Sequence, residues 1–205
     1  LHLAGPAGII ETRIESPAEP RGIALVCHPH PLFGGANTNK VTQTLARTFT
    51  RLGYVALRPN FRGVGGSAGT HADGRGEAED MLAVLDAARQ TYGDLPVVLA
   101  GFSFGAYVQA RVAQALAAAG QPAQRLVLVG TAAGFVEGAR QYDVQAVAAD
   151  TLVIHGAVDT TVPLANVLAW AEPLDLPVVV VPGADHFFHR RLHVIRDIVT
   201  RAWRH

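Results

Sequence analysis

Three residues of this chain have the types and the order needed for nucleophilic catalysis: Ser103, Asp159 and His186. A serine hydroxyl is a weak nucleophile at neutral pH, so it needs a histidine as base, and the histidine needs a carboxylate to orient it. Ser103 stands in the segment GFSFG, between a short apolar run and a helical pattern. Strand, glycine-flanked serine and helix together predict a tight turn that presents the hydroxyl at the carboxyl end of the strand.

A second segment, Gly65–Gly69, also fits Gly-x-Ser-x-Gly, with Ser67 in the middle. No apolar strand runs into it, and the residues that follow are typical of a loop. We therefore interpret Ser67 as a turn residue and Ser103 as the nucleophile. Gly101 and Gly105 are expected beside Ser103 because a side chain at either position would strike the neighbouring strand or helix.

Asp159 and His186 each come shortly after an apolar run that reads as a buried strand. The order Ser, Asp, His is the one expected when each group arrives at the carboxyl edge of a parallel sheet, where ligand crevices form. Asp159 has an alternative interpretation as the cap of a helix that begins near Thr161 or Pro163. Asp185 directly precedes His186, and neighbouring side chains diverge, so Asp185 is a poor candidate for the orienting acid.

Negative charge that develops on a substrate oxygen needs preorganised N–H donors. The backbone N–H of Phe104 would be one, at the start of the helix that follows Ser103. The second is expected from the loop HPHPLFGG, residues 28–35, after the strand that ends near Cys27. Prolines have no N–H to donate, which leaves His30 or Leu32 as the donor.

These groups need a parallel sheet to position them, and the hydrophobic pattern predicts one. Continuous apolar runs predict buried strands, and helical spacing separates them. The fold class is therefore α/β, a mostly parallel central sheet with helices on both faces, in a single domain over 1–205. Residues 1–20 predict antiparallel edge strands. Residues 131–150 leave room for one crossover helix and none for a lid. The expected strands are 22–28, 54–58, 97–100, 125–130, 151–156 and 177–183. The expected helices lie near 39–52, 76–93, 104–120 and 163–170, and a last one runs from about 186 or 187 to 201.

Composition excludes several classes of function. The chain has 205 residues, 49% hydrophobic and 17% charged, with a formal net charge of zero. Such a chain folds, and it has neither the basic patches expected for nucleic acid nor a run of about 20 apolar residues that would span a membrane. One cysteine makes the cytoplasm the default compartment. Because the chain begins at Leu1 and not at Met, a preceding signal peptide stays an open alternative.

Taken together, these motifs resemble the α/β-hydrolase superfamily, and more narrowly the small bacterial lidless serine hydrolases with an HPHP-x-x-GG oxyanion loop. The resemblance covers nearly the whole chain. It implies an α/β-hydrolase fold with no lid domain, and the family's catalytic Ser, Asp and His correspond to Ser103, Asp159 and His186. It also implies that Arg62 and Asp80 help to hold the glycine-rich loop. The matching segments are 28–35, 39–40, 58–69, 76–80, 101–105 and 155–159.

The residues and the resemblance together predict a serine hydrolase that cleaves carboxylic esters with short acyl groups through an acyl-enzyme intermediate. Its partner would be a small-molecule ester, with no cofactor; the oligomeric state is not specified. Alternatives are an acyltransferase, thioesterase or peptidase that uses the same triad, or a binding protein on the same scaffold. His186, His189 and His193 are spaced to share a face of the last expected helix, but no carboxylate-bearing motif accompanies them, so no metal is expected.

Overall fold

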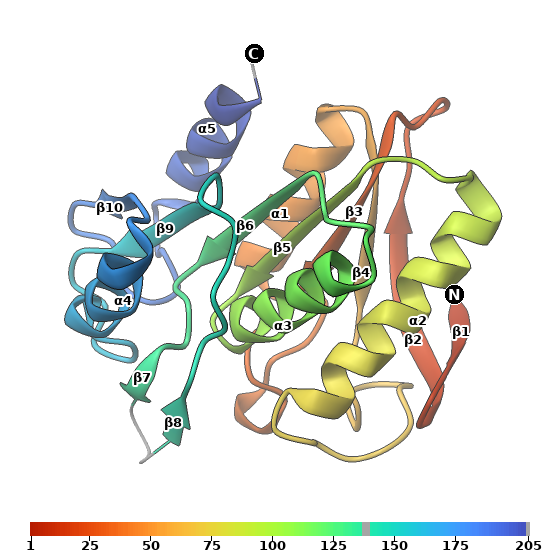
Figure 1. Cartoon of the computed structure of the whole chain (residues 1–205), viewed down its shortest axis with the longest axis horizontal. Coiled ribbons are helices and arrows are strands. Elements are labelled where there is room, and N and C mark those ends of the chain that lie inside the picture. The colour runs from red at the N-terminus through yellow and green to blue at the C-terminus, as the bar shows by residue number, and fades with distance from the viewer. Residues whose placement is uncertain (137–139, 204–205) are drawn as a thin grey trace.

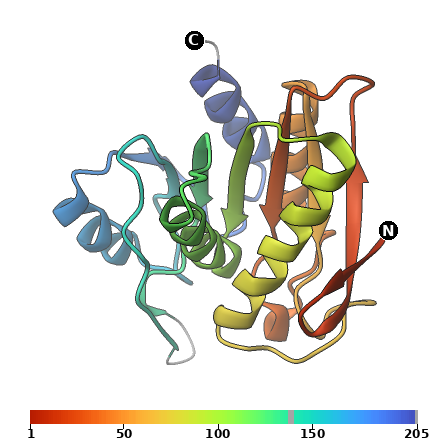
Figure 2. The same cartoon turned by 45° about the vertical axis from the view of Figure 1, so that its right-hand side comes forward.

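The computed structural model describes residues 1–136 and 140–203. Its strands are β1 (His2–Gly5), β2 (Gly8–Glu15), β3 (Gly22–Cys27), β4 (Tyr54–Pro59), β5 (Val97–Phe102), β6 (Arg125–Val129), β7 (Gly134–Val136), β8 (Arg140–Tyr142), β9 (Leu152–Gly156) and β10 (Val178–Val181). Eight of them form one sheet in the order β1-β2-β4-β3-β5-β6-β9-β10. Neighbours from β4 to β10 run parallel, whereas β2 is antiparallel to both β1 and β4. The expectation of antiparallel edge strands in residues 1–20 is confirmed by the hairpin β1–β2, which Figure 2 shows at one side of the sheet.

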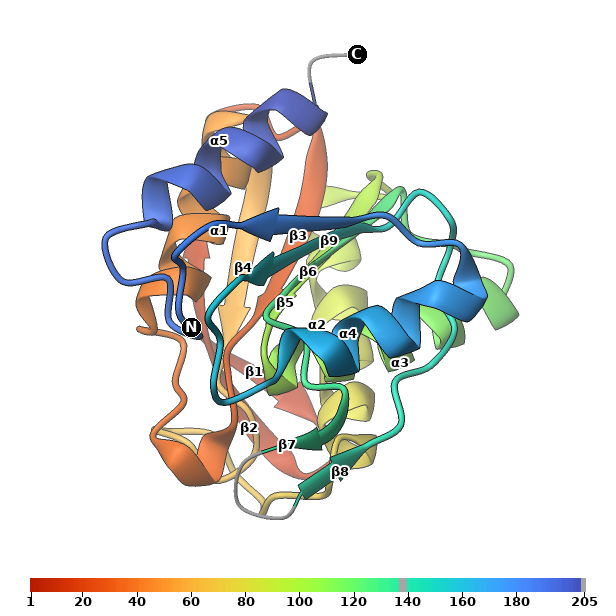
Figure 3. The ribbon, with the colours of Figure 1, turned by 90° about the vertical axis from the view of Figure 1, so that its left-hand side faces the viewer.

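Helices cover both faces of this sheet, as expected. They are α1 (Lys40–Arg51), α2 (Arg75–Tyr92), α3 (Phe104–Ala118), α4 (Leu164–Ala171) and α5 (Leu192–Ala202), with short 3₁₀ turns η1 (Pro31–Phe33) and η2 (Glu172–Leu174). Figure 3 shows α1 and α5 on one face and α2, α3 and α4 on the other. Every residue of β3, β4 and β5 is buried, because these central strands have a helix layer on each side.

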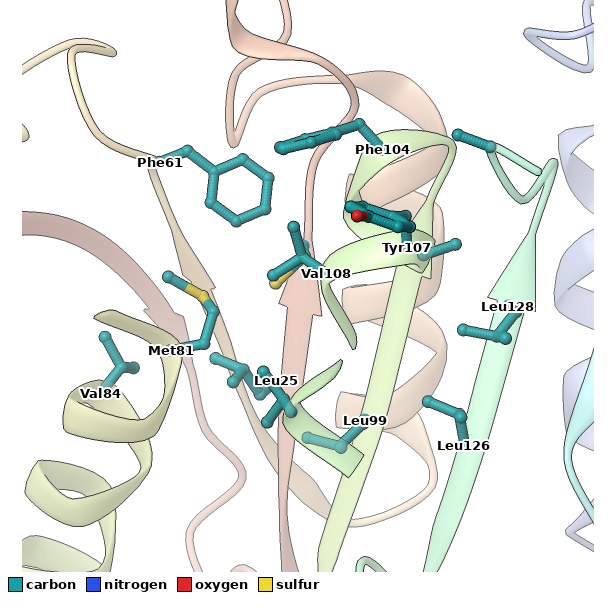
Figure 4. Packing of buried hydrophobic residues seen from close by; sticks show 14 of the residues in the cluster. Leu25, Phe61, Met81, Val84, Leu99, Phe104, Tyr107, Val108, Leu126 and Leu128 are labelled. Carbon is teal, nitrogen blue, oxygen red and sulfur yellow. The ribbon is translucent and has the colours of Figure 1, made fainter. Parts of the chain in front are cut away.

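Two apolar cores result, one on each face of the sheet. Figure 4 shows the larger one, in which Met81 of α2 and Val108 of α3 pack on Leu25 and Leu99 of the sheet. The other core joins α1 and α5 to the opposite face. The two layers hold the carboxyl ends of the parallel strands in a fixed register, which is what a multi-strand site requires.

Asn39 caps the start of α1. The Asn39 side chain accepts hydrogen bonds from the N–H groups of Val41 and Thr42, at 2.9 and 3.3 Å. This satisfies two of the orphan donors of the first turn. Asn37 has another role: its N–H donates to the Asn60 side chain at 2.8 Å and ties two loops together.

The prediction of a crossover helix within 131–150 is wrong. Where the structure describes this segment (131–136 and 140–150), it holds the two-stranded hairpin β7–β8 in place of a helix or a lid. The side chain of Asn166 in α4 explains the extended chain, because its amide donates to the carbonyl oxygens of Ala133 and Phe135 and so competes with a helical ladder.

The last helix also begins later than expected, at Leu192 rather than near residue 187. Phe188 and Arg190 have φ angles of 53° and 59°, in the left-handed region that ends a helical ladder. Residues 186–191 therefore form turns before α5. His186 and His189 lie outside the helix, so the shared helical face expected for the three histidines does not exist.

The carboxyl ends of the parallel strands face one edge of the molecule, the lower edge in Figure 1. There the turn η1, the loop that leads into α2 and the hairpin β7–β8 come together. Among the described residues, no helix is both long enough and apolar enough to cross a membrane.

Candidate active site

Ser103 lies on the turn between β5 and α3, in a strained backbone conformation with φ 56° and ψ −118°. Its N–H donates to the carbonyl of Val129 at 2.9 Å, which fixes the turn to the next strand. A Cβ at Gly101 would lie 2.3 Å from the Gly105 oxygen, and one at Gly105 would lie 2.5 Å from the Cys27 oxygen. Both glycines are therefore required by the close approach of strand and helix.

A chain of two hydrogen bonds joins the three residues that the sequence singled out. His186 Nε2 lies 3.0 Å from Ser103 Oγ, and His186 Nδ1 lies 2.7 Å from Asp159 Oδ2. A carboxylate only accepts, so Nδ1 carries the proton and Nε2 is free to accept from the serine hydroxyl. Ser103, His186 and Asp159 are 8%, 5% and 7% exposed. The hydrogen-bond chain is therefore shielded from water, yet the serine can be reached.

Asp159 combines the two interpretations that the sequence left open. Its Oδ1 accepts hydrogen bonds from the N–H groups of Thr161 and Val162, at 3.0 and 2.8 Å, while Oδ2 faces His186. One oxygen organises the turn before α4 and the other orients the imidazole. The backbone donors also hold the carboxylate in a single rotamer.

His155, at the end of β9, supports the same loop. Its Nε2 donates to the Val162 carbonyl at 3.0 Å and lies 3.5 Å from Asp159 Oδ2. Burial lowers the pKa of His155, and the nearby Asp159 opposes this effect only in part. The ring therefore contributes packing and one hydrogen bond at neutral pH.

The loop after β3 brings the candidate oxyanion donors to the elbow. Phe104 is the first residue of α3, so its N–H has no partner within the helix. The rings of His30 and Phe104 are 4.8 Å apart between centroids, which places the loop beside the helix start. The N–H of Leu32 donates to His30 Nδ1 at 3.2 Å. Among the hydrogen bonds of the described residues, none uses the N–H of His30.

His28 is a residue whose importance the sequence did not reveal. It is fully buried; its Nδ1–H donates to the Pro29 carbonyl at 2.7 Å, and its Nε2 accepts the N–H of Phe61 at 2.9 Å. Burial is the main cause that lowers the pKa of His28 to about 4. The neutral ring therefore joins the ends of β3 and β4. Only its partners in the fold, far away in the sequence, identify this role.

The glycine-rich loop is held as the resemblance implied. Arg62 donates to both carboxylate oxygens of Asp80, at 2.7 and 3.1 Å. Ser67 is buried in the same loop; its hydroxyl donates to the Asn60 carbonyl at 2.8 Å and accepts the N–H of Glu11 at 3.0 Å. These bonds give Ser67 a structural role, which confirms its interpretation as a turn residue.

Asp185 takes no part in the hydrogen-bond chain of Ser103. Its carboxylate accepts the N–H of His189 at 3.0 Å and contacts the ring of the same residue, both on the exposed side of the turn. Within residues 1–136 and 140–203, no group of three or more His, Cys, Asp or Glu side chains is arranged to hold a metal ion.

A serine on a strand–helix elbow, linked through histidine to aspartate at the carboxyl edge of a mostly parallel sheet, defines the class of α/β-hydrolases with a triad-like network. The chain belongs to the hydrolase family described as serine aminopeptidase, S33, whose model matches residues 18–153. That match includes Ser103 but ends before Asp159 and His186, which the geometry brings to the site.

Solved structures agree over the whole chain. An α/β serine hydrolase homologue from Coxiella burnetii is 39% identical, with a TM-score of 0.86 over 98% of this chain and 95% of its own. A serine hydrolase without a lid from Xanthomonas campestris is 37% identical, with a TM-score of 0.87 over 100% of this chain and 92% of its own.

A sequence relative covers a shorter part of the chain. An uncharacterised protein from Rickettsia prowazekii is 43% identical over 110 residues, which are 53% of this chain. The match spans only 46% of that curated relative's length.

Proposed function

We propose that this protein is a serine hydrolase that cleaves carboxylic esters by a two-step acyl-enzyme mechanism. The observation that carries the proposal is the hydrogen-bond chain from Ser103 through His186 to Asp159. It supplies the nucleophile, the base and the orienting acid at one open edge of the sheet, with the imidazole tautomer already set.

In the first step, Ser103 Oγ attacks the ester carbonyl carbon while its proton passes to His186 Nε2. The tetrahedral intermediate collapses, the bond to the alcohol oxygen breaks, and the alcohol leaves with the proton from His186. In the second step, water attacks the carbonyl carbon of the acyl group and gives a proton to His186. The bond between this carbon and Oγ then breaks, the carboxylic acid leaves, and Oγ takes the proton back from His186. Asp159 stays ionised and stabilises the imidazolium.

We assign the oxyanion donors to the N–H groups of Phe104 and His30. The N–H of Leu32 is occupied by His30 Nδ1, which favours His30 over Leu32. Gly105 supports the assignment, because its lack of a side chain allows the start of α3 to approach the end of β3. In this assignment the two N–H donors stabilise the negative charge that develops on the carbonyl oxygen in the transition state.

For straight acyl chains we propose a preference for short ones, about two to six carbons. Each buried methylene contributes about 0.8 kcal/mol, but only while it is removed from water. Strand β8 (Arg140–Tyr142) lines one side of the site, and the described part of residues 131–150 holds no helix that would cover it. Longer chains would extend into solvent and gain nothing further.

The test is a series of esters with one alcohol and straight acyl chains from acetyl to dodecanoyl. We expect the specificity constant to be highest at two to six carbons, without a jump in rate above the solubility limit of the ester. A maximum at long chains with interfacial activation would contradict the proposed preference. No hydrolysis of any ester, with turnover of a thioester, a peptide anilide or an acyl acceptor, would instead favour the alternative reactions of the same triad.

A further inference from the structure

Next to the proposed oxyanion donors lies a pocket of about 410 Å³ that the mechanism does not use. Its walls come from four segments that are distant in the sequence: η1, the loop into α2, the start of α3 and the strand β8. Six of its lining side chains carry rings: His30, Phe33, His71, Phe104, Tyr107 and Tyr142.

We propose that this pocket binds a flat aromatic ring of the ester, which makes aryl-substituted esters the preferred substrates. The inference rests on the proposed function and extends it to a substrate class. His30 and Phe104 belong both to the pocket and to the proposed oxyanion site, so a ring held there is joined to the reacting carbonyl by a short linker.

The rings form a continuous aromatic floor. The centroids of His30, His71 and Phe104 are 4.7 to 5.2 Å apart in all three pairs. Tyr142 lies 5.1 Å from Tyr107 and 6.2 Å from Phe104. Figure 4 shows Phe104 and Tyr107 close together at one end of the larger core, so packing from below holds these faces in place. Rings at these distances favour edge and offset contacts with another ring.

Phe33 is a lining residue of the pocket that keeps a large exposed surface. It is a large apolar side chain at 66% exposure, and the guanidinium of Arg140 lies 4.2 Å above its ring centre. A ring bound in the pocket against Phe33 would remove part of this exposed surface from water. Four of the other rings, those of His30, Phe104, Tyr107 and Tyr142, are already buried.

Size and charge also fit an aromatic ring. Apolar cavities of about 150 Å³ bind benzene, so about 410 Å³ accommodates a ring with its linker. His30 is uncharged at neutral pH, because burial, with help from His71 and Arg140, lowers its pKa to about 4. At neutral pH the ring of His30 therefore adds no formal charge to the aromatic floor.

The test compares esters that differ only in the ring. Ethyl 3-phenylpropanoate is set against ethyl 3-cyclohexylpropanoate, and 2-phenylethyl acetate against 2-cyclohexylethyl acetate, with ethyl acetate as reference. Within each pair the carbon count is equal and the cyclohexyl group is the thicker. We expect the phenyl ester to have a specificity constant about 2- to 10-fold higher in at least one pair, the effect expected of specific ring contacts. The pair that responds tells whether the ring belongs to the acid or to the alcohol.

Two matched variants assign the effect to the pocket. Phe33→Leu keeps an apolar side chain but removes the ring, and the phenyl-to-cyclohexyl ratio should fall toward one. Phe135→Leu makes the same change at another exposed phenylalanine, in the hairpin but outside the pocket lining, and should keep the wild-type ratio and the wild-type rate on ethyl acetate. An equal fall of the ratio in both variants would contradict the proposal.

Binding gives a readout that does not depend on hydrolysis. In Ser103→Ala, 3-phenylpropanoate should bind more tightly than 3-cyclohexylpropanoate, measured by calorimetry or by NMR titration. If ethyl acetate is hydrolysed with Ser103 but cyclohexyl equals or exceeds phenyl in both ester pairs, the aromatic pocket is refuted while the proposed function stands. If no ester is hydrolysed, the proposed function fails, and the binding comparison alone decides on the pocket.

Discussion

Burial of His28 should make the free energy of unfolding fall in acid, and the substitution His28→Gln should remove this part of the pH dependence. The ring is fully buried and joins Pro29 to Phe61 with one donor and one acceptor, an arrangement that only the neutral form allows. In the unfolded chain the same imidazole is free to take up a proton. Acid therefore favours the unfolded state until the buried ring itself is protonated.

The pKa of His28 is lowered from 6.5 to about 4, mainly by burial. Above pH 6.5 both states are neutral, and the group adds no pH dependence. As the pH falls from 6.5 to 4, only the unfolded chain binds the proton, and stability drops by about 1.36 kcal/mol for each pH unit. The total loss over this window is about 3 kcal/mol, and below pH 4 the contribution levels off.

The assay is chemical denaturation of wild type and His28→Gln at several values between pH 4.5 and 7.5. The variant should be less stable at pH 7, because its amide cannot replace the packing against Phe61, and its stability should fall less steeply in acid. Phe61→Leu is the matched control: it weakens the same contact but keeps the imidazole, so the wild-type slope should remain. Equal slopes in wild type and His28→Gln would refute the reasoning.

Three further outcomes are expected. Asp159→Asn preserves an oxygen for the turn before α4 but presents an amide to His186. Turnover should therefore fall by up to ~10⁴ with little change in the free energy of unfolding. A comparable loss of turnover in Asp185→Asn instead would show that the acid is misassigned. Gly105→Ala places a Cβ 2.5 Å from the backbone oxygen of Cys27, so it should lower stability by about 1–3 kcal/mol and also reduce turnover. An unchanged denaturation midpoint would contradict the close approach of α3 to β3. Chelators should leave ester hydrolysis unaffected. A loss of activity that added zinc reverses would instead favour a metal site that involves His186, His189 and His193.

The parallel sheet was predictable because its strands are apolar throughout and its helices are amphipathic. The same pattern predicted the sheet edge at which Ser103, Asp159 and His186 meet, since strand ends fix positions without any knowledge of packing. The local turn of Ser103 was predictable too, because its glycines report a steric requirement that the structure confirms. The compartment stays a prediction.

The two elements that were predicted wrongly depend on features that a local sequence pattern does not report. The hairpin β7–β8 is held by Asn166, which lies beyond the next strand in the sequence. The delayed start of α5 follows from left-handed residues such as Phe188, for which the sequence carries no glycine signal. The roles of His28 and of the aromatic pocket likewise arise only when separate loops are brought together.

The most direct test of the central claim is covalent labelling with a fluorophosphonate probe, which reacts with an activated serine. Wild type and Ser67→Ala should both be labelled, and the modified peptide should contain Ser103. Ser103→Ala should remain unlabelled while its denaturation midpoint shows that it is folded. Labelling that persists in folded Ser103→Ala, or that disappears in folded Ser67→Ala, would contradict the account.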